Sequence, residues 1–458
     1  MLKFEYKKHI WPIHRTRNLV RLYAVQPGKA FAENSRQVFY DALNFLQNRT
    51  DPRQVNGKQE DIVTVPPFDI LTFPELFLPK STLCEFLQGL SNLPLSGCVH
   101  SGIRPDSGKG YFFNKSHALE FIEELYVIPG MHGDDLSAIK LYIQNEEVNS
   151  KFNFAAFFTK DRYGETRICL HPKVVRSKYE HGKMAEFHVT EAKFLSTITL
   201  LPSNENGFPI NVFPLICADL LNKPRDTNLP SPLEAISGNG IKLDEDQTPL
   251  EAIDIVSVVT ATPSSGVTHA TWKEEFRKSL EEAASGQISP RLQNAAFVMA
   301  NYAYFDDIQQ GEKAGLSGIF FTNPKAIGEE LSQKVGKEVY RHFEGEIYCR
   351  PPSHIRKERF AGITEREADW FRWKDQLVPR EYKPTWPTLG IFLYIPSEPV
   401  ENTPTIFTAT LSAPPRFIRK WEDSSAISNI ALYRARAIEF KLDPNEKPVV
   451  RYDFFPES

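Results

Sequence analysis

The sequence predicts an α/β protein built in layers. The chain has 458 residues, which is enough to bury a large core. Near its start, a strand pattern, a helix pattern and a second strand pattern follow one another over residues 18–26, 32–47 and 61–73. Further short apolar runs, bounded by turn residues, occur later. A β-α-β order followed by more buried strands is typical of layered α/β folds.

The opening elements differ in their periodicity. Residues 18–26 (NLVRLYAVQ) form a mostly apolar run that stops at Pro27 and Gly28, which predicts a strand and a turn. Residues 32–47 carry apolar side chains on one helical face: Val38, Phe39, Ala42, Phe45 and Leu46. The second strand, in residues 61–73, ends just before Pro74 and Glu75.

Later segments are assigned in the same way. Helices are expected over residues 79–93, 117–126 and 272–284. Strands are expected over residues 96–103, 153–173 (as a hairpin turning at 161–165), 210–216, 253–262, 315–321, 345–349, 389–395 and 405–411. Residues 129–150 fit neither pattern and are interpreted as an insertion. Residues 222–247 are rich in Pro, Asn, Asp and Gly and are interpreted as a surface loop.

Composition and charge narrow the class of protein. The chain has 54 basic and 58 acidic residues, a net charge of −4 and a pI near 6.3, which gives no general attraction to nucleic acid. Mean hydropathy is −0.36, and no apolar run approaches the length of a membrane span. The first residues lack the apolar core of a signal peptide. A cytoplasmic protein is therefore expected.

The five cysteines are widely spaced: Cys84, Cys98, Cys169, Cys217 and Cys349. Their number is odd, and there is neither a Cys-x-x-Cys pair nor the Cys and His spacing of a zinc site. Free thiols are expected, with no metal and no organic cofactor.

Three polar residues each follow an apolar run. Glu75 comes after Phe73 and Pro74, Lys173 closes the second arm of the hairpin, and Cys217 ends the run over residues 210–216. Taken alone, such a cysteine is more often a small buried hydrophobe, such an acid is a solvated strand end, and such a lysine lies on the surface. Their common position at strand ends favours a shared site.

The local frames of these residues resemble those of a known family. The order Glu, Lys, Cys, with Phe73-Pro74-Glu75 and Ile216-Cys217-Ala218-Asp219, resembles the nitrilase or carbon–nitrogen hydrolase superfamily. The resemblance covers about residues 18–350. It implies a four-layer α-β-β-α sandwich and homo-oligomers. It suggests a catalytic domain over residues 1–350, and it leaves residues 351–458 as a C-terminal extension that the family does not explain.

The resemblance implies a catalytic role for each of the three residues. Cys217 attacks the carbon of a small amide or nitrile, Glu75 first takes the thiol proton and later protonates the leaving nitrogen, and a thioester forms. Lys173 and the backbone N–H of Ala218 stabilise the negative charge of the intermediate. Relatives use a second glutamate to hold the lysine, for which Glu180 is the candidate. Asp219 is expected to cap the helical turn that follows.

Two alternatives remain open at this point. An acyltransferase would pass the thioester to an amine instead of water. A non-catalytic scaffold would instead bind a partner through the basic segment 351–380, which contains Trp370 and Trp373. Acidic residues are mixed among the basic ones there, which argues against nucleic-acid binding. The extension is either an appended subdomain or an arm that completes a neighbouring subunit.

Overall fold

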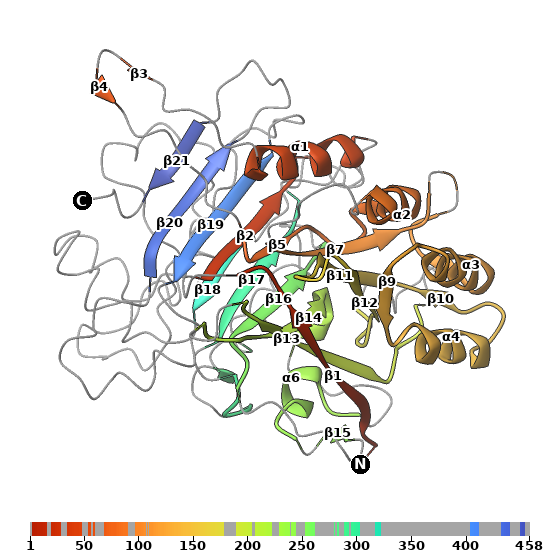
Figure 1. Ribbon diagram of the computed structural model, residues 1–458. Helices are drawn as coiled ribbons and strands as arrows, with labels where there is room; N and C mark the ends of the chain where they lie inside the picture. The colour runs from red at the N-terminus through yellow and green to blue at the C-terminus, as the bar shows by residue number, and fades with distance from the viewer. Residues whose placement is uncertain are drawn as a thin grey trace, which may run out of the picture.

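The computed structural model gives the chain two large β-sheets and an outer layer of helices (Figure 1). It describes residues 2–15, 20–28, 34–47, 54–55, 58–59, 68–89, 97–106, 108, 110–177, 189–203, 207–221, 229–238, 240–243, 252–261, 279, 282–283, 288–292, 295–302, 317–321, 404–411, 432–439 and 449–453. A mixed α/β fold is confirmed.

The larger sheet has ten strands. In spatial order they are β21 (Val449–Asp453), β20 (Leu432–Glu439), β19 (Thr405–Leu411), β2 (Val20–Gln26), β5 (Ile70–Thr72), β7 (Cys98–Arg104), β11 (Phe154–Lys160), β12 (Thr166–Pro172) and β9 (Met131–Asp134), with β6 (Leu78–Pro79) beside β7. Strands β2, β5 and β7 are parallel, whereas β11 is antiparallel to both β7 and β12.

The smaller sheet has seven strands. Their order is β15 (Ile241–Lys242), β1 (Phe4–Pro12), β13 (Phe194–Leu201), β14 (Ile210–Ile216), β16 (Ile255–Val259), β17 (Ala296–Ala300) and β18 (Gly318–Phe321). Strands β14, β16 and β17 are parallel and almost entirely apolar, as expected of strands buried on both faces. Two short pairs, β3 (Gln54–Val55) with β4 (Lys58–Gln59) and β8 (Phe113–Asn114) with β10 (Lys151–Phe152), complete the described strands.

The two sheets pack face to face. One apolar core joins side chains of the larger sheet, such as Leu22 and Phe157, to side chains of the smaller sheet, such as Val212 and Val256. We call this the first core. Because successive residues of a strand point to opposite faces, the neighbouring Tyr23 belongs to a second core, on the other face of the larger sheet. The chain thus has a double-sheet interior.

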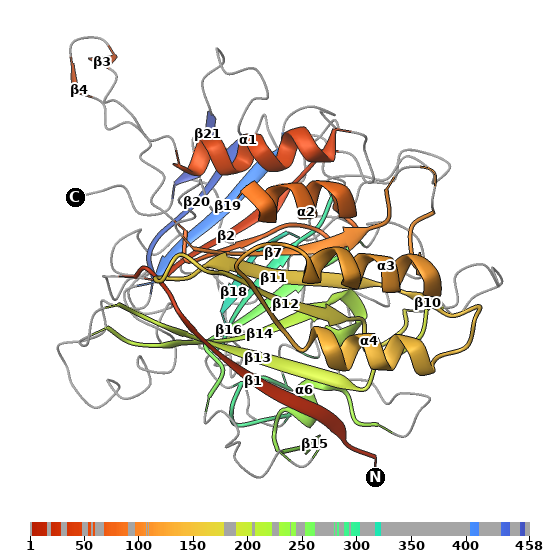
Figure 2. The same ribbon diagram turned by 45° about the vertical axis from the view of Figure 1, so that its right-hand side comes forward.

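Four helices cover the other face of the larger sheet. They are α1 (Ser35–Gln47), α2 (Lys80–Gly89), α3 (Lys115–Tyr126) and α4 (Leu136–Asn145), and Figure 2 shows them following one another along that face. Each contributes apolar side chains to the second core, among them Phe39, Phe86, Phe121 and Ile139. No helix among the described residues is long and apolar enough to cross a membrane.

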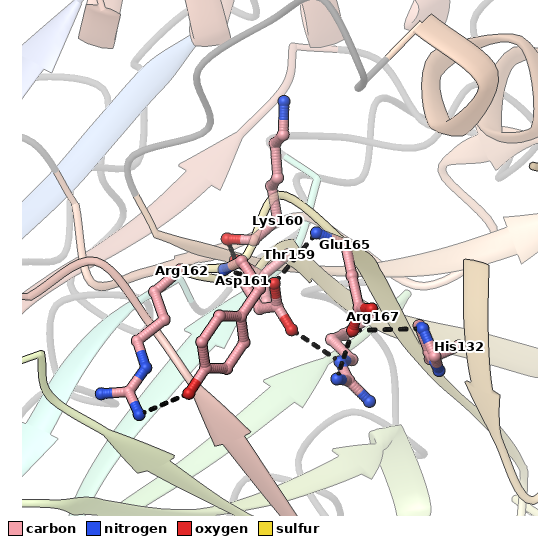
Figure 3. A network of polar contacts seen from close by, with 8 residues as sticks. His132, Thr159, Lys160, Asp161, Arg162, Glu165 and Arg167 are labelled. Carbon is pink, nitrogen blue, oxygen red and sulfur yellow. Dashed lines mark hydrogen bonds and ion pairs between the residues drawn. The ribbon is translucent and has the colours of Figure 1, made fainter. Parts of the chain in front are cut away.

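The hairpin of β11 and β12 is fixed by a buried acid at its turn (Figure 3). The Asp161 carboxylate accepts hydrogen bonds from the backbone N–H groups of Tyr163 and Glu165, each at 2.9 Å, and pairs with Arg167 Nε at 2.9 Å. Glu165 also pairs with His132 of β9 at 3.1 Å. These contacts set the register of the hairpin, and the register decides which residues face each other at its open end.

Several sequence-based expectations need correction or addition. Residues 129–150 are not an insertion, because they form β9 and α4, which extend the larger sheet and its helical layer. The described part of the loop over residues 222–247 contains the short helix α6 (Pro232–Ala235) and β15. Strands β1 and β13 were not predicted, although they pair over eight residues, Glu5–Pro12 with Phe194–Leu201. The helix predicted over 272–284 falls largely outside the described residues, as do the segments 345–349, 351–380 and 389–395.

The predicted strand over residues 405–411 is confirmed and has a definite place. It is β19, which pairs antiparallel with all seven residues of β2. Ile406 and Leu411 are buried, and they contribute to the second and the first core, respectively. This part of the C-terminal segment therefore completes a sheet of its own chain. The domain division at residue 350 stays a prediction.

Candidate active site

Glu75 follows β5 and is held firmly through its backbone. Its N–H donates to the Thr260 carbonyl at 3.1 Å, and its carbonyl accepts a hydrogen bond from the Tyr302 hydroxyl at 3.0 Å. The next residue, Leu76, has a φ of 55°, which is strained for a side chain of this size. Gly102 of β7 lies against this bend, and an added Cβ would come within 2.4 Å of Glu75 Cα. The close approach requires glycine here.

The Glu75 carboxylate is buried and has three donors. Oε1 accepts from Lys173 Nζ at 2.8 Å and from Asn153 Nδ2 at 2.7 Å, and Oε2 accepts from the Ala261 N–H at 3.1 Å. Only 3% of Glu75 is exposed. Three donors on a buried carboxylate fix its orientation and support its charge.

Lys173 lies at the open end of the β11–β12 hairpin. Its N–H donates to the Asn153 carbonyl at 2.8 Å, and its carbonyl accepts from the Ala192 N–H at 3.0 Å. The side chain is buried and forms an ion pair with Glu75. A buried ion pair is tolerated because each charge compensates the other, and removal of one partner leaves an uncompensated charge.

Cys217 begins a 3₁₀ turn, η3 (Cys217–Leu220), directly after β14. Its φ is 46°, a left-handed conformation that non-glycine residues rarely adopt. The side chain is 4% exposed and packs in a small cluster with Ala155, Ile216 and Val259. A strained turn between a strand and a helix is the kind of geometry that presents a nucleophile at the end of a sheet.

The backbone brings the Glu75 and Cys217 segments together. Ile216 pairs in register with Val259 of β16, and the next residues of that segment, Thr260 and Ala261, hold Glu75. The candidate site therefore lies at the carboxyl ends of β5, β12, β14 and β16, where ligands commonly bind in parallel sheets.

Asp219 joins the cysteine turn to the lysine segment. Its Oδ1 accepts from the N–H groups of Val174 (3.0 Å) and Val175 (2.6 Å), and its Oδ2 accepts from the Ile216 N–H at 3.1 Å. Burial raises the pKa of Asp219 to about 7, while Lys173 and these backbone donors oppose that rise. Its contacts tie Cys217 and Lys173 together through their neighbours.

The remaining predicted residues are placed as follows. Ala218 directly follows Cys217 in η3, so its backbone N–H belongs to the turn. Glu180 lies outside the described residues. Sequence reasoning missed Asn153, Tyr302 and Ala261 as partners of Glu75. Asn153 carried a weak signal, since it is a polar residue directly before an apolar strand.

A chain of hydrogen-bonded, buried polar side chains lies on strands that lead to the site. His100 Nε2 is 3.0 Å from His171 Nε2, His100 Nδ1 is 2.8 Å from Ser257 Oγ, and Thr72 Oγ1 is 2.8 Å from the same hydroxyl. Burial lowers the pKa of His171 to about 3, and burial together with His171 lowers the pKa of His100 well below its usual value. Both imidazoles are therefore neutral. The chain links β5, β7, β12 and β16.

The comparisons with known proteins give distant matches among solved structures. No family model matches the chain, and no curated protein matches it. Among solved structures, a carbon–nitrogen hydrolase from Helicobacter pylori G27 has a TM-score of 0.36 at 10% identity, over 67% of this chain and 82% of that one. A glutamine-dependent NAD+ synthetase from Acinetobacter baumannii, solved with ADP, has a TM-score of 0.33 at 14% identity, over 67% of this chain and 41% of that one. This degree of likeness does not assign a function.

Proposed function

We propose that this protein is a thiol-dependent carbon–nitrogen hydrolase that cleaves an amide or a nitrile through a thioester on Cys217. The observation that carries the proposal is the buried ion pair between Glu75 and Lys173, at 2.8 Å. The segment that contains Lys173 is also hydrogen-bonded to Asp219, which lies in the turn that begins at Cys217, a residue with a strained backbone. A buried acid–base pair beside a nucleophile is the arrangement that covalent catalysis needs.

In this mechanism each group has a separate task. Glu75 takes the proton of the Cys217 thiol as sulfur attacks the substrate carbon. Lys173 and the Ala218 N–H donate to the atom on which negative charge develops. With an amide, Glu75 then passes the proton to the leaving nitrogen, the C–N bond breaks, and water activated by Glu75 releases the acid from the thioester. With a nitrile, the attack gives a protonated thioimidate, to which water adds before ammonia leaves and the thioester forms. These steps require neither a metal nor an organic cofactor.

The proposal includes the finer features that the resemblance implies. The fold is a four-layer α-β-β-α sandwich, with a second helical layer over the smaller sheet. Glu180 holds Lys173 in position, the chains form homo-oligomers, and the protein acts in the cytoplasm on a small-molecule substrate.

The test is mass spectrometry of the intact protein after exposure to a library of amides and nitriles. We expect an acyl adduct that disappears in Cys217→Ala and persists in Cys84→Ala, since Cys84 is a buried thiol on α2 whose pKa burial raises to about 12. An adduct that persists in Cys217→Ala, or no adduct with any compound, would refute the proposal.

A further inference from the structure

Asn153 has an amide group whose orientation is settled by its partners. Its Nδ2 donates to Glu75 Oε1 at 2.7 Å. A carboxylate only accepts hydrogen bonds, so the amide nitrogen, and not the amide oxygen, must face Glu75. The direction of Asn153 Oδ1 is thereby fixed as well.

Asn153 Oδ1 is a buried acceptor without a hydrogen-bond partner among the described residues. The residue is 1% exposed. Native proteins rarely leave such an atom unpaired, and a catalytic role is one of the explanations for those that do. This oxygen therefore needs a donor that the described protein does not supply.

The position of this oxygen relates it to the cysteine. Asn153 directly precedes β11, and its carbonyl continues the hydrogen bonding of the β11–β12 hairpin by accepting from the Lys173 N–H at 2.8 Å. Ala155 is two residues further along this extended segment, so the two side chains point to the same face of the sheet. Ala155 packs in the cluster that contains Cys217 and Val259. The Asn153 amide thus stands on the face that meets the proposed nucleophile and next to the proposed acid, Glu75.

We propose that Asn153 Oδ1 accepts a nitrogen-bound hydrogen of the substrate, which makes the site selective for amides that carry at least one N–H. The inference rests on the proposed function. In the tetrahedral intermediate the leaving nitrogen must turn its lone pair toward the protonated Glu75. An acceptor that takes one N–H fixes that orientation. The proton then moves to nitrogen, the C–N bond breaks, and the amine departs with the electron pair.

A nitrile nitrogen and an ester oxygen carry no hydrogen and leave Asn153 Oδ1 unpaired. Sites that hydrogen-bond a substrate N–H or O–H reject analogues without it, because a buried polar group is then left unsatisfied. Selectivity against nitriles and N,N-disubstituted amides follows from this one atom.

The test compares three probes with a common acyl group: the p-nitroanilide, which has one N–H, the N-methyl-p-nitroanilide and the p-nitrophenyl ester, which have none. Acetyl, butyryl and benzoyl series cover acyl groups of different size. In Asn153→Leu we expect kcat/KM for the anilide to fall about 10-fold to 100-fold further than kcat/KM for the ester. The ratio of the two values does not depend on how much of the variant is folded, since both probes report on the same active molecules.

Tyr302→Phe is the matched control. This substitution removes the hydrogen bond to the Glu75 carbonyl and leaves Asn153 in place. It should therefore lower kcat/KM for the anilide and for the ester by the same factor. If kcat/KM falls equally for both probes in Asn153→Leu, Asn153 acts only by positioning Glu75, and the inference is overturned. A wild-type protein that cleaves the ester and the N-methyl anilide but not the anilide would also overturn it. If the ester leaves no acyl group on Cys217, the proposed function fails, and the inference fails with it.

Discussion

The ion pair of Glu75 and Lys173 links chemistry to stability at the level of single residues. Both side chains are buried, and their charged groups are 2.8 Å apart. In a low-dielectric interior, a charge that loses its partner is strongly destabilising. Substitutions that remove one charge should therefore affect both turnover and folding, and the two effects can be separated.

The first prediction concerns the loss of the Glu75 charge, alone and together with the Lys173 charge. Glu75→Gln should lower the rate of Cys217 acylation by about 10²-fold to 10⁴-fold, because the proton acceptor is lost. It should also lower the free energy of unfolding by about 3–5 kcal/mol, because the buried Lys173 ammonium loses its ion pair with the Glu75 carboxylate. The double variant Glu75→Gln/Lys173→Met should recover much of the stability and none of the activity. Urea unfolding and stopped-flow acylation measure the two quantities, and a double variant no more stable than Glu75→Gln would contradict the argument.

The second prediction concerns the neutral histidines. His171 has a pKa of about 3 in the folded protein and about 6.5 when unfolded, so the unfolded chain binds the extra proton. This contribution to stability is present above pH 6.5 and is lost as the pH falls toward 3, at about 1.4 kcal/mol per pH unit. Urea unfolding of the wild type and of His171→Gln at pH 7.5 and 5.5 isolates it, since Asp219 titrates alike in both. Equal pH dependence in the two proteins would contradict a neutral buried His171.

What the sequence could reveal at this scale was the end of each strand. Apolar runs placed Glu75, Lys173 and Cys217 at strand termini, and the Glu75–Lys173 contact follows from how those strands pack. The sequence could not place Asn153 or Tyr302 beside Glu75, because these contacts join segments far apart in the chain and depend on sheet order. No local pattern encodes that order.

At the level of elements, the site is assembled at turns with constrained backbones. Cys217 and Leu76 both have positive φ, and each lies in the segment directly after a strand. Such conformations persist only where the surrounding contacts hold them. At Leu76 one of those contacts is with Gly102, whose lack of a side chain lets β7 approach the Glu75 bend.

The third prediction therefore concerns Gly102. An alanine there would place its Cβ 2.3 Å from Leu76 N, which is backbone and cannot move aside cheaply. We expect Gly102→Ala to displace Glu75, to lower kcat/KM at least 10-fold and to cost about 1–3 kcal/mol of stability. Gly89→Ala in α2 is the control, since nothing lies within 4 Å of its added Cβ and alanine favours helix there. Activity and thermal unfolding check both variants, and a fully active Gly102→Ala would be contrary to this account.

The elements themselves could be predicted unevenly from the sequence. Strands β2, β11, β12, β14 and β16 were found because their runs are apolar and bounded by turns. Strand β1 was missed because Lys7 and Lys8 interrupt its pattern, although Phe4, Tyr6 and Trp11 are buried. Strand β13 (FLSTITLL) did carry a β-branched pattern that could have been recognised. Strand β9 is short and contains glycine, so its sequence carries little strand signal. It is recognised from its pairing with β12.

For the whole molecule, the place of β19 matters most. This strand comes from near the C-terminal end of the chain and covers the edge of β2. Ile406 is fully buried within the core that α1 to α4 share with the larger sheet. The C-terminal part of the chain thus contributes to the packing that supports the candidate site.

The fourth prediction tests this packing. Ile406→Ala should lower the free energy of unfolding by about 2–5 kcal/mol, the usual cost of deleting a buried isoleucine side chain to alanine. Leu141→Ala is the matched control, because Leu141 on α4 is 59% exposed, and its change should stay within about 0.5 kcal/mol. Chemical denaturation of the purified variants gives both values. If Ile406→Ala proves as stable as the wild type, β19 does not pack on β2 as described.

The pairing of β2 with β19 also has a consequence for biosynthesis. The ribosome makes β19 (Thr405–Leu411) long after β2 (Val20–Gln26), because several hundred residues lie between the two strands. At about 5–20 residues per second, translation leaves tens of seconds between the two. Throughout that interval the nascent polypeptide presents an open strand edge that other chains can join. The edge is covered only after β19 has been made and has paired with β2.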